Sequence, residues 1–113
     1  YILDKKTAPA VCAKLSNNGE VSLGDIYKKP SNRENALKMV PLVLRRGKVI
    51  KVLPANDLQL RVNDEILFCM QPKEKIFLES NLSNRYTLEY LLTGKDPARG
   101  YLFKWLERKN IVS

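Results

Sequence analysis

The side chains most able to take part in chemistry are cations gathered in one part of the chain. Residues 28–51 hold eight Lys or Arg residues against Glu34 alone, and they carry most of the net charge of +8 in this 113-residue sequence. Such a segment attracts phosphates or another anionic surface. It is more often a solvated strand face, where Lys and Arg keep a protein soluble and protect a sheet edge. The candidate ligand-binding residues are Arg45, Arg46, Lys48, Lys51, Asp57 and Asp64.

The sequence contains no His, which excludes Ser/His/Asp and Cys/His catalysis and most zinc sites. The carboxylates do not supply an alternative catalytic group. Asp64 and Glu65 are adjacent, so in a strand they point to opposite faces and cannot share a proton, and Asp57 fits a turn cap better than a base. The five glycines are scattered and form no phosphate-binding loop. We therefore expect no enzyme and no metal site.

The two cysteines, Cys12 and Cys69, each lie in an apolar stretch and do not form a CxxC pair. Two buried thiols in a reducing cytoplasm are the favoured interpretation. A disulfide is the alternative if the two stretches are neighbouring strands.

The elements that must position the cations are predicted most clearly over residues 39–70. Residues 39–45 and 49–53 form two strands around a turn at 46–48, a second turn follows at 54–57, and 65–70 is an apolar strand. Three successive strands predict a meander. Pro41 cannot donate to a sheet ladder, so it indicates a sheet edge or a bulge.

The remaining pattern predicts helices and short strands around this sheet, so the fold class is α+β. Residues 8–15 and 21–27 alternate as strands, and Ser31 with Glu34 would cap a helix over 31–39. Residues 73–82 are predicted helical, and 87–92 fit either a strand or a helix. An amphipathic helix over 101–109 would dock on protein, or alternatively on an anionic membrane surface.

The length fits one domain, preceded by something else, because the chain starts with Tyr1 and not Met. We expect a linker over residues 1–9, a core over 10–72 and a C-terminal extension over 73–113. No apolar run is long enough to cross a bilayer, and no signal peptide opens the chain.

A basic nucleic-acid adaptor is the alternative function. However, residues 28–51 contain no aromatic side chain on which a base could stack, and no zinc-finger, RRM or KH signature occurs. We therefore expect no nucleic-acid partner.

The run from Val40 to Pro54 and the residues after it resemble the C-terminal regulatory domain of potassium-conductance regulators, called RCK-C or TrkA-C. The resemblance covers about residues 15–70. Asn63 stands where the family usually has Gly, and Asn also tolerates a positive φ. The matching residues, in order, are Arg45, Gly47, Pro54, Asp57, Leu60 and Asp64.

Most of the matching residues have structural roles. Gly47 allows the hairpin turn, Pro54 sets the second turn, Leu60 fills the core, and Asn63 with Asp64 bends the chain into the last strand. They build a scaffold, so function must lie in what the scaffold binds or pairs with.

The resemblance implies a dimerising regulatory module on the cytoplasmic side of the inner membrane, in a bacterial potassium channel or uptake protein. It implies two-fold dimers, often in larger rings, a pore, and an upstream Rossmann domain that could hold NAD or NADH. No cofactor is expected on these residues. A small anionic ligand would bias gating by linkage. Since Arg45 and Arg46 project to opposite faces of a regular strand, only one of them would face a given pocket.

Overall fold

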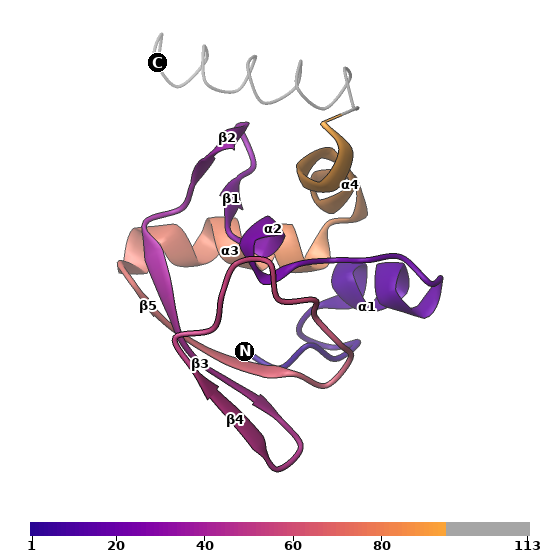
Figure 1. The fold of residues 1–113 in the computed structure, drawn as a ribbon. Coiled ribbons are helices and arrows are strands. Elements are labelled where there is room, and N and C mark those ends of the chain that lie inside the picture. Colours follow the sequence, from indigo (N-terminus) through magenta and orange to yellow (C-terminus); the bar gives the residue numbers. More distant parts are fainter. Residues whose placement is uncertain (95–113) are drawn as a thin grey trace, which may run out of the picture.

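The computed structural model describes residues 1–94, so the helix predicted over 101–109 lies outside the described residues. The fold is α+β, with helices gathered on one side of a three-stranded antiparallel sheet (Figure 1). The elements in chain order are α1 (Pro9–Ser16), α2 (Leu23–Ile26), β1 (Lys28–Lys29), β2 (Asn32–Ala36), β3 (Met39–Arg46), β4 (Val49–Val52), β5 (Glu65–Met70), the 3-10 helix η1 (Pro72–Glu74), α3 (Lys75–Ser83) and α4 (Arg85–Thr93).

The three predicted strands of the sheet are confirmed, but the predicted meander is wrong. The sheet order is β4-β3-β5, so β5 pairs with β3 and not with β4. The loop over 53–64 causes this order, because it crosses the helical side and pairs with residues 21–23. Leu60 N–H donates to the Val21 carbonyl at 2.8 Å, and Leu23 N–H donates to the Leu58 carbonyl at 2.9 Å.

The special backbone positions agree with the turn residues read from the sequence. The β3–β5 register shifts between Pro41 and Val43, which confirms the predicted bulge. Gly47 has a φ of +59° in the hairpin turn, and Asn63 has a φ of +71° at the bend before β5. Asn63 therefore adopts the left-handed conformation for which Gly is usually required.

Three predictions for the first 39 residues are wrong, and the first two concern residues 8–27. The strand predicted over 8–15 is wrong, because Pro9–Ser16 forms α1 with Ala8 as its N-cap. Ala8, Val11, Cys12 and Leu15 have helical spacing, and Pro9 fits a first turn. Residues 21–27 contain one bridge at Ser22 and then the short helix α2.

The helix predicted over 31–39 is the strand β2 instead, paired with β1. Residues 32–36 are mostly exposed and offer no apolar stripe that a helix could bury, and the buried Leu37 and Met39 follow only after β2 ends. A carboxylate cap occurs earlier in the chain, where Asp25 accepts hydrogen bonds from the N–H and hydroxyl of Ser22, at 3.1 and 2.9 Å.

The helix predicted over 73–82 is confirmed as η1 and α3, and the undecided segment 87–92 lies in α4. Asn84 caps α4 by accepting from the N–H groups of Tyr86 and Thr87, at 3.0 and 3.1 Å. Gly94, with a φ of +71°, ends the helix.

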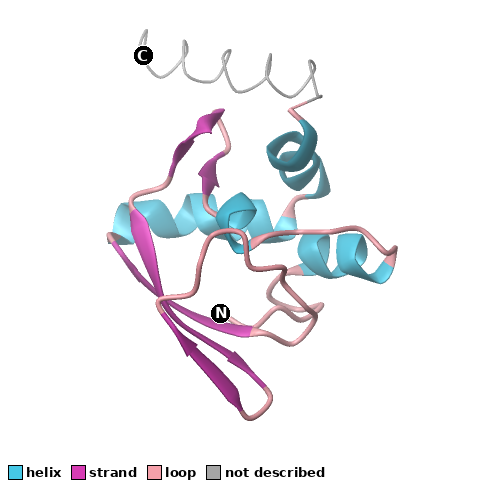
Figure 2. Cartoon of the chain, in the orientation of Figure 1, coloured by secondary structure: helices cyan, strands magenta, loops and turns pink. Residues whose placement is uncertain are grey.

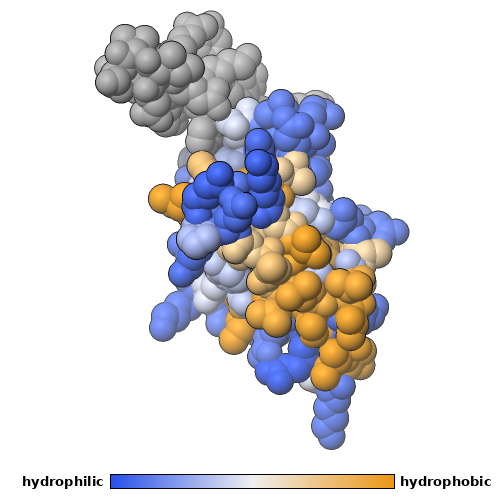
Figure 3. Space-filling view, turned by 90° about the vertical axis from the view of Figure 1, so that its left-hand side faces the viewer, coloured by the Kyte–Doolittle hydropathy of each residue, from blue (hydrophilic) through white to orange (hydrophobic). Residues whose placement is uncertain are grey.

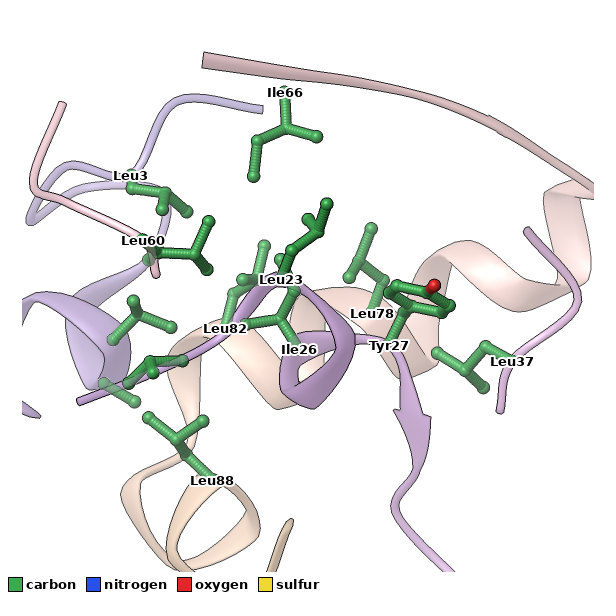
Figure 4. Packing of buried hydrophobic residues seen from close by; sticks show 14 of the residues in the cluster. Leu3, Leu23, Ile26, Tyr27, Leu37, Leu60, Ile66, Leu78, Leu82 and Leu88 are labelled. Atoms are coloured by element: carbon green, nitrogen blue, oxygen red, sulfur yellow. The ribbon is translucent and has the colours of Figure 1, made fainter. Parts of the chain in front are cut away.

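One core joins all parts of the described chain, including the expected linker and extension. Leu3 from residues 1–9 and Leu78 and Leu82 from α3 are fully buried, and they point toward Leu23 and Ile66 (Figure 4). Tyr1 and Leu3 also extend the sheet, because Ile66 N–H donates to the Tyr1 carbonyl at 2.7 Å and Leu3 N–H donates to the Asp64 carbonyl at 2.8 Å. Residues 1–9 and 73–94 therefore contribute to the same hydrophobic core as residues 10–72.

We expect Leu82→Ala to lower the free energy of unfolding by about 2–5 kcal/mol, because it leaves a cavity in the core. Ile76→Ala, on the same helix but at a side chain that is 69% exposed, should change it by about 0.5 kcal/mol or less. Urea unfolding of both variants measures the difference. Equal effects would contradict the packing of α3 into this core.

Candidate functional site on the outer face of the sheet

The six candidate ligand-binding residues do not converge on one site. Arg46 pairs with Asp64, whereas Arg45 pairs with Glu65 across β3 and β5. Asp57 lies in the turn after Pro54 and lines a different groove, beside α2 and β2. Lys48 and Lys51 are exposed on the hairpin, and within residues 1–94 no salt bridge reaches either of them.

The ion pair between Arg46 and Asp64 has a structural role, and we call this pair with its hydrogen bonds the lock. Asp64 is fully buried, and its carboxylate accepts Nε and Nη2 of Arg46 at 2.9 Å each and the Arg61 N–H at 2.9 Å. Nη2 of Arg46 also donates to the Gln59 carbonyl at 2.9 Å. The bonds to Asp64 raise the pKa of Arg46. These two candidates form charge-assisted hydrogen bonds with each other, so they stabilise the fold.

The lock also reaches the N-terminal segment. Asn63 N–H donates to the Leu3 carbonyl and Leu3 N–H to the Asp64 carbonyl, both at 2.8 Å. The β3–β4 hairpin, the loop before β5 and residues 1–3 are thereby tied together at Asp64.

The strand register gives the opposite face of the sheet a regular pattern. Ile2, Glu65, Arg45 and Ile50 form one row across the strands, because each is the cross-strand partner of the next. Leu67, Val43 and Val52 form the second row, and Cys69 and Val40 form the third. We call this surface of nine residues the outer face.

The outer face is largely apolar and is left uncovered. Its exposed fractions are 52% for Val40, 62% for Ile50, 72% for Val52 and 59% for Leu67. None of the described helices lies against this side of the sheet (Figure 2), and a contiguous apolar patch covers this part of the surface (Figure 3). An apolar surface of this kind usually marks an interaction site.

The outer face has no excess charge, although the chain is strongly basic. Arg45 and Glu65 are its charged residues, and they form an ion pair with each other. Lys51 is the cross-strand partner of the buried Leu44, so it belongs to the other side of the hairpin. The basic surface and the apolar surface are therefore separate.

The sequence suggested either two buried thiols or a disulfide between Cys12 and Cys69, and the structure agrees fully with neither. Both are free, so the disulfide is absent. Cys12 is buried as predicted, its thiol donates to the Leu3 carbonyl at 3.2 Å, and burial raises its pKa. Cys69 is exposed, so its predicted burial is wrong. Cys69 is exposed because it lies two residues after Leu67 in β5, which places its side chain on the outer face as well.

Groups for metal or redox chemistry do not gather in the described part of the chain. Residues 1–94 bring together no set of three or more His, Cys, Asp or Glu side chains that could hold a metal ion. Over the same range, every helix is too short or too polar to cross a bilayer. No family model, no curated protein and no solved structure matches this chain.

One sequence signal for the outer face was available. Both arms of the hairpin are apolar on both sides, as in Leu42-Val43-Leu44 and Val49-Ile50. A continuous apolar run is typical of a strand that is covered on both faces. The alternation within β5 was harder to interpret, because Leu67 points outward between the inward-facing Ile66 and Phe68.

We expect Asp64→Asn to lower the free energy of unfolding by about 3 kcal/mol, because it removes the charge that Arg46 pairs with in a buried position. Glu89→Gln, at the exposed ion pair with Lys14 and away from the outer face, should cost under about 1 kcal/mol. Urea unfolding at neutral pH compares the two variants. A loss at Glu89 as large as that at Asp64 would argue against the lock.

Proposed function

We propose that this chain is a cytoplasmic regulatory domain of a potassium channel or potassium transport protein, which dimerises through its outer face and couples ligand binding to gating. The observation that carries the proposal is the uncovered apolar face, built by Val43, Ile50, Val52 and Leu67. An exposed apolar surface of this kind usually marks an interaction site, which a regulatory binding module requires.

A second copy of the chain is the partner that suits this face. Two molecules of net charge +8 repel each other, so they can associate only where the excess charge is absent. The outer face meets this condition, because its single cation is balanced by its single carboxylate. In a two-fold dimer the same surface meets itself, so a neutral apolar face is self-complementary.

The resemblance to RCK-C domains supports the potassium-transport part of the proposal. Two of the residues that carry it have the scaffold roles expected of them, since Gly47 has a positive φ and Leu60 is buried in the core. Asn63, which stands where the family usually has Gly, also has a positive φ. Asp64 has a further role, since its lock joins the N-terminal segment to the hairpin.

The lock suggests how a gating signal would pass. A movement of an upstream nucleotide-binding domain, with its NAD or NADH, would pull on residues 1–3 and hence on the hairpin that forms the dimer face. The small anionic ligand would bind to the exposed cations of the hairpin, Lys48 and Lys51. A ligand with different affinities for two dimer arrangements would then shift the pore's equilibrium.

We expect Leu67→Lys to convert a concentration-dependent dimer into a folded monomer, because it places two like charges in an apolar interface. Ile76→Lys is the matched control, since Ile76 is also well exposed, at 69% against 59% for Leu67, but lies on α3. Light scattering after size exclusion gives the mass, and circular dichroism checks the fold. A wild-type monomer that binds DNA and RNA at physiological salt would instead favour the nucleic-acid adaptor.

The transport part is tested on the full-length protein in lipid vesicles, with potassium flux as the readout. We expect a flux whose dependence on nucleotide is lost in Leu67→Lys and kept in Ile76→Lys, because gating requires the paired domains. Absence of potassium flux, or identical nucleotide responses in the two variants, would refute the proposal.

A further inference from the structure

We propose an ion-pair exchange across the dimer, in which each Arg45 keeps its own Glu65 and also faces Glu65 of the partner copy, and which sets the register of the interface. This inference rests on the proposed dimer and names the residues that determine its specificity. Its starting point is an ion pair in the first row of an otherwise apolar face, with exposed Ile50 beside it in the same row and exposed Leu67 in the next row.

The position of the pair fits a two-fold axis. Arg45 and Glu65 are cross-strand partners, so their Cβ atoms are about 5 Å apart. A two-fold axis that lies in the interface plane, parallel to β3 and β5 and midway between Arg45 and Glu65, places each cation opposite the other copy's carboxylate. The four charges then alternate in sign, and each has two neighbours of the opposite sign.

Burial of the pair explains why the exchange is needed. In the isolated chain the side chains of Arg45 and Glu65 are 56% and 36% exposed, so water still solvates both charges. A second copy would remove this water, and a single ion pair recovers the desolvation cost poorly. A second pair of opposite charges across the interface offsets the cost that one pair leaves.

The neighbouring rows then make other registers unfavourable. A shift by one row would bring Arg45 and Glu65 against Val43 and Leu67 of the other copy. Each charge would lose its water without gaining an intermolecular partner. The pair therefore selects one arrangement among several that the apolar residues alone would allow.

The test reverses each charge separately and then mixes the variants. Arg45→Glu makes the outer face acidic and Glu65→Arg makes it basic, so each variant repels its own copies. We expect each to weaken self-association at least about tenfold, the fold-change that corresponds to the lower end of measured couplings between close charges. An equimolar mixture should restore dimers, because the acidic and basic faces attract each other.

Sedimentation equilibrium measures the dissociation constants, and thermal unfolding verifies that every variant folds. Arg85→Glu is the matched control, with the same change of charge on the exposed start of α4 and away from the outer face, and it should dimerise like the wild type. Single variants that dimerise normally, or a mixture that stays monomeric, would overturn the exchange while leaving the dimer intact. A monomeric wild type would overturn both the exchange and the proposed function.

Discussion

The buried carboxylate of Asp64 is the constraint on which the rest of the structure depends. A fully buried charge is costly unless it is paired and hydrogen-bonded, and Asp64 is satisfied by Arg46 from β3 and by the Arg61 N–H. Since the backbone on either side of it also bonds to Leu3, the hairpin, the loop before β5 and the N-terminal segment have one common anchor. This anchor uses the inward-facing arginine and leaves Arg45 on the outer face.

The consequence is a sheet with two different sides. The inner side is closed by Leu44 and Ile66 against the helices, and the outer side keeps an equally apolar surface exposed around the Arg45–Glu65 pair. An uncovered apolar sheet is a liability for aggregation unless a specific partner covers it. The proposed two-fold contact, which includes a charge pair, would offer specificity as well as cover, and it would let a strongly basic chain associate with itself at its neutral surface.

The sequence predicted the parts of the fold that local chemistry determines. Strong apolar strands and turn residues with clear backbone preferences, such as Gly47 and Asn63, were identified correctly. The errors occurred where two periods fit the same residues: α1 was interpreted as a strand although Val11 and Leu15 also have helical spacing. The site could be predicted only as a set of charged residues. Whether Arg45 and Arg46 pair with Glu65 and Asp64 depends on the strand order β4-β3-β5. That order is determined by long-range packing, which the local sequence does not show.

Hydroxyl-radical footprinting of the wild-type chain across a dilution series tests the central claim most directly, because it reports the exposure of single side chains. The dimer predicts that Ile50 and Leu67 are protected at high concentration and become reactive on dilution, while Ile76 on α3 stays reactive throughout. Equal reactivity of Ile50 and Leu67 at every concentration would contradict a buried outer face.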